Sequence, residues 1–146
     1  MLAGAVGTVA AAVVGWQRTG SVETPTAVHG VIAGVVSAAG APLDLTVLRA
    51  VIFATVGTLL ALAVIELLPR VTVDDPVGVV GVFGAAGLWG TLAVGITNAE
   101  QLSAQLVGAL ILLAGSVVVA GVLFGALRLT RVLRLPPDVE IVGLDR

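Results

Sequence analysis

The chain has 146 residues, of which 58% are hydrophobic and only 11% are charged, and its mean hydropathy is +1.16. Soluble domains carry about 25% charged residues, so the composition excludes an ordinary soluble protein and predicts an integral membrane protein. The chain contains no cysteine, which excludes disulfides, thiolate metal sites and a cysteine nucleophile. A net charge of −2 without any basic cluster gives no support to nucleic-acid binding.

Long apolar runs predict membrane-spanning helices, because the strands of a membrane barrel alternate between apolar and polar residues. A secretory signal is the weaker alternative for the first run, since its nearest charge, Arg18, follows the run instead of preceding it. The fold class that we expect is all-α, an integral membrane bundle of five transmembrane helices. The predicted crossings are 2–17, 26–41, 47–68, 76–97 and 102–127, within a transmembrane region at 1–127 that is followed by a cytoplasmic tail at 128–146.

The arginines predict the orientation of these crossings. Cytoplasmic loops carry an excess of Lys and Arg, and five crossings place the two termini on opposite sides. With the C-terminus inside, only Arg49 lies outside, so we expect the N-terminus out and the C-terminus in. An outward N-terminus without a signal sequence suggests that a further segment normally precedes Met1. The arginines on the inner side are then Arg18, Arg70, Arg128, Arg131, Arg134 and Arg146.

The second run carries Gly30 and Gly34, whose spacing of four allows two membrane helices to approach closely. His29, near the start of this run, is expected to be a helix-end histidine that water or backbone satisfies, in preference to a proton-handling residue. Glu66 and Arg70 are four residues apart, which favours a modest solvated ion pair.

The fourth run contains the most specific pattern. Asp75 is expected to cap the helix, and Pro76 suits its first position because proline has no N–H to leave unpaired. Each step of three residues turns about 300° around an α-helix, so a row of glycines spaced by three winds around the helix and lets several neighbours approach it. Trp89 lies in mid-helix and is expected to pack, whereas Trp16 suits the membrane interface. The winding glycines are Gly78, Gly81, Gly84, Gly87 and Gly90.

The fourth run resembles the tenth helix of the Amt/Mep/Rh ammonium transporter family, and the whole chain resembles helices seven to eleven, the C-terminal half. The tenth-helix match is specific, whereas the matches before Asp74 are weak. The last helix and the tail also resemble the family, down to Gly143, Leu144 and Asp145 near the end. The matching segments of the tenth helix are Asp74-Asp75-Pro76, Gly81-Val82-Phe83-Gly84 and Gly87-Leu88-Trp89-Gly90-Thr91-Leu92-Ala93-Val94-Gly95.

Phe83 departs from the family pattern. The resemblance implies a hydrophobic pore crossed by two stacked histidines, one from the fifth helix and one from the tenth. Phe83 stands at the tenth-helix histidine, and a phenyl ring can neither accept nor relay a proton. We expect Phe83 to face the pore together with Val79 and Val80, although a packing role is the alternative. Gly78 also replaces an acidic residue of the family.

The resemblance implies ammonium or ammonia transport by a partial transporter that needs a partner to supply the missing helices. It also implies an oligomer, a trimer in the family, and a tail that docks on a neighbouring subunit or a signal-transduction regulator. The alternative is a non-conducting membrane scaffold or regulatory subunit derived from the same fold. No catalytic triad, phosphate loop or metal-ligand spacing is present, so the sequence predicts neither an enzyme nor a cofactor.

Overall fold

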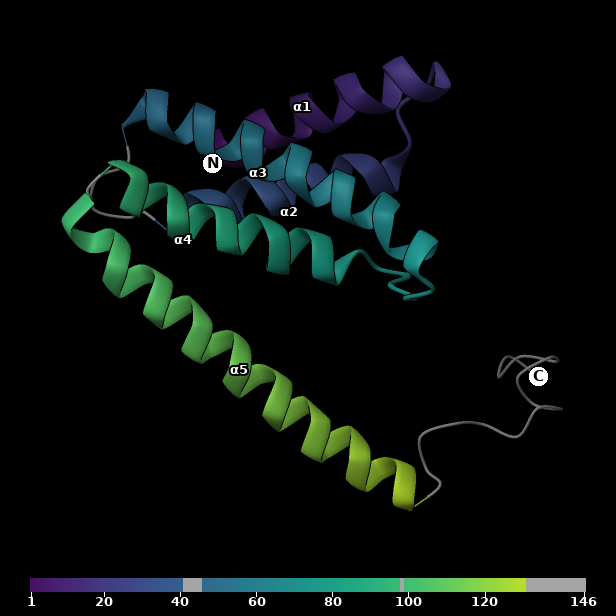
Figure 1. Cartoon of the computed structure of the whole chain (residues 1–146). Helices are drawn as coiled ribbons and strands as arrows, with labels where there is room; N and C mark the ends of the chain where they lie inside the picture. Colours follow the sequence, from purple (N-terminus) through teal and green to yellow (C-terminus); the bar gives the residue numbers. More distant parts are fainter. Residues whose placement is uncertain (41–45, 98, 131–146) are drawn as a thin grey trace, which may run out of the picture. The chain divides into compact units, whose positions relative to one another are not determined.

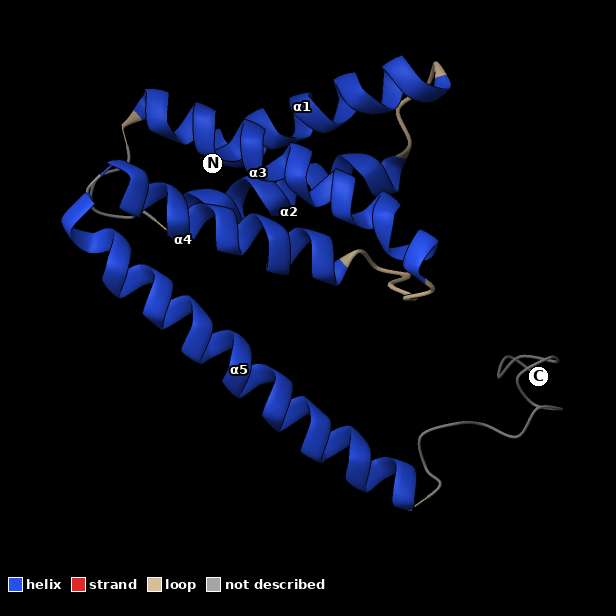
Figure 2. Ribbon diagram, viewed as in Figure 1, coloured by secondary structure: helices blue, strands red, loops and turns tan. Residues whose placement is uncertain are grey.

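The structure is a computed structural model, which describes residues 1–40, 46–97 and 99–130. Within these ranges the chain forms helices and loops without any strand (Figure 2), as the all-α prediction requires. A 3₁₀ turn, Leu68–Val71, follows α3, and a π-helical segment, Val80–Ala85, leads directly into α4. The α-helices are α1 (Leu2–Thr19), α2 (Thr24–Ala39), α3 (Val47–Leu67), α4 (Ala86–Thr97) and α5 (Ala99–Leu129).

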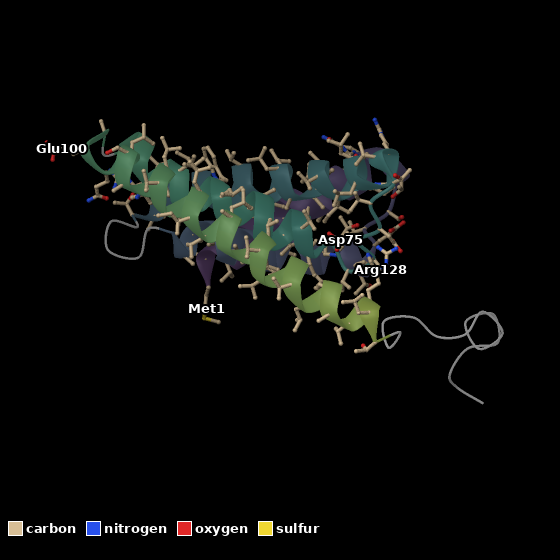
Figure 3. All side chains as sticks on the ribbon, turned by 60° about the horizontal axis from the view of Figure 1, so that its bottom comes forward. Met1, Asp75, Glu100 and Arg128 are labelled. Atoms are coloured by element: carbon tan, nitrogen blue, oxygen red, sulfur yellow. The ribbon has the colours of Figure 1, made fainter. Side chains whose placement is uncertain are left out.

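The chain divides into two units, residues 1–106 and 107–146. In the first unit α1 packs on α2 and α3, which in turn contact the π-helical segment and α4 (Figure 1). Asp75 and Glu100 lie at opposite ends of this bundle (Figure 3). The described part of the second unit is the remainder of α5, which buries no residue and exposes mainly valine and leucine side chains.

Small residues bring the helices of the first unit together. Gly30 and Gly34 of α2 are both buried, and a Cβ added at Gly30 would lie 2.5 Å from the Ala11 Cβ of α1. A Cβ at Gly34 would press on the carbonyl oxygen of Ala3. The predicted close approach of helices at this glycine pair is therefore confirmed, and it follows the packing rule of membrane helices, whose contact surfaces are built from small residues.

Two buried hydroxyls join helices that the small residues bring close. Ser37 of α2 is fully buried and donates to the carbonyl of Ala33 at 2.7 Å and to that of Ala86 in α4 at 3.3 Å. Thr58 of α3 is also fully buried, and its hydroxyl donates to the carbonyl of Gly30 at 3.4 Å. Hydrogen bonds of this kind between membrane helices contribute about 0.6 kcal/mol on average, so they add to the packing instead of replacing it.

Two of the described helical segments are long and apolar enough to cross a membrane, namely Val47–Val71 and Ala99–Leu129. Thr24–Ala39 and Val80–Gly95 are apolar but shorter. Length and composition therefore support a membrane protein, while the prediction of five crossings stays a prediction.

The fourth helix begins later than the sequence predicted. We expected it to start at Pro76, but Pro76 and Val77 form a turn that the Gly78 N–H closes on the Asp75 carbonyl oxygen at 3.1 Å. Gly78 then takes a left-handed φ of +69°, which a residue with a side chain rarely adopts. The helical backbone starts at Val79, because this glycine redirects the chain before the helix can form.

The fifth helix is longer than the predicted range of 102–127, since it runs from Ala99 to Leu129. Glu100 lies in its first turn and Arg128 in its last, so each charge complements the partial charge of the helix end beside it. Glu100 and Gln101, which fall between the predicted fourth and fifth crossings, therefore belong to the helix.

Candidate functional site

Asp75 holds the start of the fourth helix. Its Oδ1 accepts from the Val79 N–H at 2.9 Å and its Oδ2 from the Val80 N–H at 2.8 Å. The predicted capping role is confirmed. Asp75 is not the residue next to the helix, however, and its carboxylate reaches across the turn to the N–H groups four and five positions later. Both bonds are charge-assisted and satisfy two N–H groups that have no partner inside the helix.

Asp75→Ala is expected to lower the free energy of unfolding by about 1–2 kcal/mol, the loss measured when helix caps are removed. Asp74→Ala provides a matched control, because the neighbouring carboxylate is exposed and makes no hydrogen bond or ion pair within the described residues. Unfolding in mixed detergent micelles measures both variants. Equal losses would show that the effect arises from general charge and not from the cap.

Val79, Val80 and Phe83 lie on a common side of the fourth helix that α2 and α3 leave uncovered. Their exposed fractions are 50%, 47% and 55%. Gly84 and Leu88 continue this exposed side toward α4. We call these five residues the open face. The structure therefore brings the three predicted pore residues together on an apolar surface that carries no titratable group.

The backbone at the open face is π-helical from Val80 to Ala85. A π-helical turn widens the helix, occurs mostly as single turns and is frequent at functional sites. Phe83 therefore lies in an irregular turn, and the spacing of apolar residues gave no signal of it.

The other sides of the fourth helix are buried against its neighbours. Gly81 faces α3, where an added Cβ would lie 2.6 Å from the Ala61 carbonyl oxygen, and Gly90 faces the Ser37 backbone of α2. Gly84 and Gly87 have more room, since the first atoms that a Cβ would meet are 3.9 and 3.6 Å away. The glycines thus face different neighbours, as the predicted winding requires.

Trp89 of α4 packs against α3. Its indole N–H donates to the Phe53 carbonyl oxygen at 3.2 Å, and the two rings meet edge to face with centroids 6.2 Å apart. Phe53 also lies in a buried cluster with Ala93 and Val94. The structural role predicted for Trp89 is confirmed, and Trp16, at 67% exposure, remains available for the membrane interface.

His29 ties α2 to the turn before the fourth helix. Its Nε2 lies 3.1 Å from the Val77 carbonyl oxygen, and a Cβ added at Gly78 would lie 2.9 Å from the same nitrogen. The expectation for this histidine was a partner from water or the backbone, and the structure supplies one from the backbone. The imidazole occupies space that a side chain at position 78 would need.

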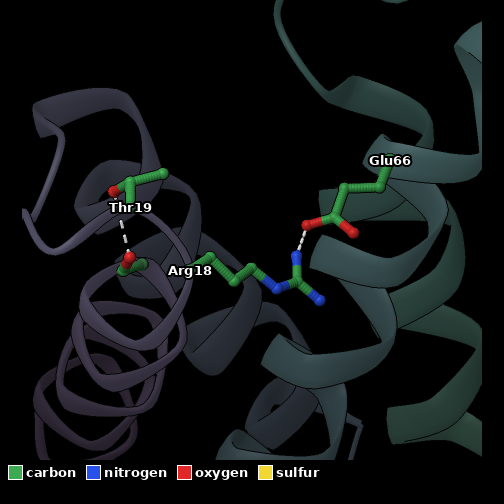
Figure 4. A network of polar contacts seen from close by, with 4 residues as sticks. Arg18, Thr19 and Glu66 are labelled. Carbon is green, nitrogen blue, oxygen red and sulfur yellow. Dashed lines mark hydrogen bonds and ion pairs between the residues drawn. The ribbon is translucent and has the colours of Figure 1, made fainter.

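Arg18 pairs with Glu66 and so joins the end of α1 to the end of α3 (Figure 4). The sequence had favoured Arg70 as the partner of Glu66, which is wrong. Arg70 lies in the 3₁₀ turn, where the helical geometry that brings residues four apart together has ended. Because the two side chains are about half exposed, at 50% and 46%, the pair contributes little to stability.

Arg18, Glu66 and His29 all line one cavity at this end of the bundle, with a volume of about 300 Å³. We call it the end cavity. Glu23, in the loop before α2, also lines it. Sequence reasoning missed this grouping because its members come from three helices and a loop. Within the described residues no group of three or more His, Asp or Glu side chains could hold a metal ion.

Part of the predicted site lies outside the described residues. This applies to the tail residues Gly143, Leu144 and Asp145 and to the arginines Arg131, Arg134 and Arg146. The docking role expected of the tail therefore stays a prediction.

The sequence model of the Ammonium Transporter Family matches residues 1–146. The chain belongs to the ammonium transporter family. Relatives agree, among them a putative ammonium transporter of Synechocystis, 36% identical over 120 residues, and an ammonium transporter of Haloferax mediterranei, 31% identical over 145 residues. These alignments cover 80% and 95% of this chain but only 27% and 28% of the two relatives. No solved structure matches the chain significantly.

Membership of the ammonium transporter family, together with the two membrane-capable helices, assigns the chain to a membrane. An ammonium transporter of Archaeoglobus fulgidus is 26% identical over 165 residues, and the alignment covers 99% of this chain and 35% of the relative. The chain thus spans about a quarter to a third of the length of these relatives.

Proposed function

We propose that the chain forms the C-terminal helices of a membrane protein that transports ammonium or ammonia. The observation that carries this proposal is the open face, where Val79, Val80 and Phe83 share one uncovered apolar side of the fourth helix. An apolar wall suits the passage of neutral ammonia and disfavours ions, because burying an unpaired charge is costly. The family membership supports the same substrate.

Conduction through this wall requires helices beyond those described, because a face that is about half exposed cannot enclose a path by itself. The relatives contain about three times as much chain, which supports a requirement for further helices. A longer form of this chain or a separate partner would supply them. Assembly into a trimer and docking of a regulator on the tail are part of the same proposal.

In the proposed orientation the N-terminus lies outside and the tail lies in the cytoplasm. The arginine distribution supports this arrangement, since only Arg49 falls on the outer side. The end cavity and Asp75 then lie on the cytoplasmic side, where α1 and α3 end and α2 and the fourth helix begin.

Uptake of ¹⁴C-methylammonium into proteoliposomes tests the proposal. We expect the chain reconstituted alone to give no uptake above empty liposomes, and the chain co-reconstituted with the N-terminal six helices of a relative to give saturable uptake that ammonium inhibits. Specific, saturable uptake by the chain alone would contradict the need for further helices. Absence of uptake from a purified, correctly assembled complex would contradict transport itself.

A non-conducting scaffold or regulatory subunit is the second candidate function. Phe83 favours it, because no side chain of the open face can accept or relay a proton. A scaffold would co-purify with a membrane partner that is unrelated to transporters, and substitutions at Phe83 would leave flux unchanged.

A further inference from the structure

We propose that His29 of α2 is a positioning residue for the open face. By holding the carbonyl group of Val77, it fixes the direction in which the fourth helix leaves its turn, and so keeps Val79, Val80 and Phe83 on the uncovered side. This inference rests on the proposed transport of ammonium or ammonia, and it assigns part of the geometry of the path to a residue of another helix.

The contact between His29 and the turn is a hydrogen bond with a defined direction. Its Nε2 lies 3.1 Å from the Val77 carbonyl oxygen, within the range of N–H···O hydrogen bonds. A carbonyl oxygen can only accept, so Nε2 carries the hydrogen and donates. The two residues are 48 positions apart, so the bond arises from the tertiary fold and not from the local sequence.

The bonds made by Asp75 join the turn to the fourth helix. Its carbonyl oxygen accepts from the Gly78 N–H, and its carboxylate accepts from the N–H groups of Val79 and Val80. All of these bonds lie within residues 75–80, so they hold the turn and the first helical residues together as one unit. The bond from His29 connects this unit to α2 and thereby sets its orientation in the bundle.

Gly78 lets the turn sit between α2 and α3. Its φ is +69°, and an added Cβ would lie 2.9 Å both from Nε2 of His29 and from Cδ1 of Ile65 in α3. Three positions later Gly81 also faces α3. Successive residues of a helix point in different directions, so with these two glycines turned inward the open face is turned outward.

A positioning role does not depend on the charge of His29. The imidazolium ion carries a hydrogen on both ring nitrogens, so Nε2 donates to Val77 in either charge state. Proton handling would instead require the ring to gain and lose a proton during transport. The charged side chains that line the end cavity with the ring are Arg18, Glu23 and Glu66, and the turn adds Asp75.

Amide hydrogen exchange of the full chain in nanodiscs tests the positioning without any transport. Leucine is similar in size to histidine and has no donor, whereas the side-chain amide of glutamine keeps an N–H group at about the reach of Nε2. We expect His29→Leu to speed exchange at Val79 and Val80 about fivefold, the effect of one lost hydrogen bond. His29→Gln should restore the exchange rates of the unaltered chain.

Thr58→Val is the matched control for exchange. It removes the hydrogen bond that the Gly30 carbonyl of α2 receives from α3, but it does not touch the turn. We therefore expect exchange at Val79 and Val80 to stay unchanged in this variant.

Uptake of ¹⁴C-methylammonium by the co-reconstituted complex relates the bond to transport. At equal assembly we expect His29→Leu to lower uptake about fivefold, in proportion to the loss of the bond. His29→Gln should retain both the uptake and its pH profile, because glutamine donates without titrating. A changed pH profile in His29→Gln would show proton handling and overturn a purely positioning role.

Unchanged exchange in His29→Leu would overturn the positioning role, and so would faster exchange that His29→Gln fails to restore. Equally faster exchange throughout α1 would show a general loss of stability and would also overturn it. Faster exchange at the turn with normal uptake would overturn the link to the path. A complex that gives no uptake even with unaltered His29 contradicts the proposed transport, whereas exchange still decides whether His29 holds the turn.

Discussion

Gly30→Ala is expected to lower the free energy of unfolding by about 3 kcal/mol, the upper end of the range for overpacked cores. The added Cβ would lie 2.5 Å from the Ala11 Cβ and would press on the Gly7 carbonyl oxygen of α1. Neither obstacle is the movable end of a long side chain, so α1 and α2 would have to separate.

Gly108→Ala is the matched control for this substitution, since a Cβ at Gly108 in α5 meets no atom within 4 Å. The same chemical change there should be neutral or slightly stabilising, because alanine is the better helix former. Unfolding by SDS in mixed micelles, followed by the fluorescence of Trp89 and Trp16, measures both variants. A loss in Gly108→Ala as large as that in Gly30→Ala would show that steric contact between α1 and α2 is not the cause.

Close packing of helices could be predicted from the sequence wherever the spacing of small residues indicates it. Gly30 and Gly34, four residues apart, and two glycines of the fourth helix, Gly81 and Gly90, marked close approaches. A missing side chain acts locally and does not depend on which neighbour packs against it. The same holds for Trp89 in mid-helix, whose large ring has to pack somewhere in a bundle. These predictions needed no knowledge of how the helices are arranged.

Helix boundaries and ion-pair partners were harder to predict, because the local sequence allows alternative turns and alternative partners of similar energy. Asp75 was recognised as a cap, but Pro76 suits both the first turn of a helix and the turn before it. The left-handed φ of Gly78 selects the second possibility. Glu66 likewise had an acceptable partner four residues away, and the tertiary fold supplied Arg18 instead.

The candidate site likewise contains residues that the sequence could group and residues that it could not. Val79, Val80 and Phe83 could be grouped in advance, because the resemblance to the family's tenth helix implied that they face a pore. The end cavity could not, since Arg18, Glu23, His29 and Glu66 come together only when three helix ends meet. The π-helical turn at Phe83 also has no signature in the order of apolar residues.

Phe83→His is expected to raise methylammonium flux about tenfold to a hundredfold in the assembled complex. An N–H group that passes an apolar wall without a partner loses about 1–3 kcal/mol, and each 1.4 kcal/mol corresponds to a tenfold change in rate. A ring nitrogen at position 83 would supply an acceptor on the open face, where Phe83 is 55% exposed within the described residues. An imidazole ring is smaller than a phenyl ring, so the substitution adds no bulk to the path.

Leu88→His provides the control, because it places the same ring on the same face but more than one helical turn away from position 83. We expect it to change flux much less than Phe83→His does. Flux is measured as ¹⁴C-methylammonium uptake per assembled complex, with co-purification of the partner as the check on assembly. If Phe83→His assembles normally and leaves uptake unchanged, the open face does not line a conduction path. That result would contradict transport along this face and support the scaffold function.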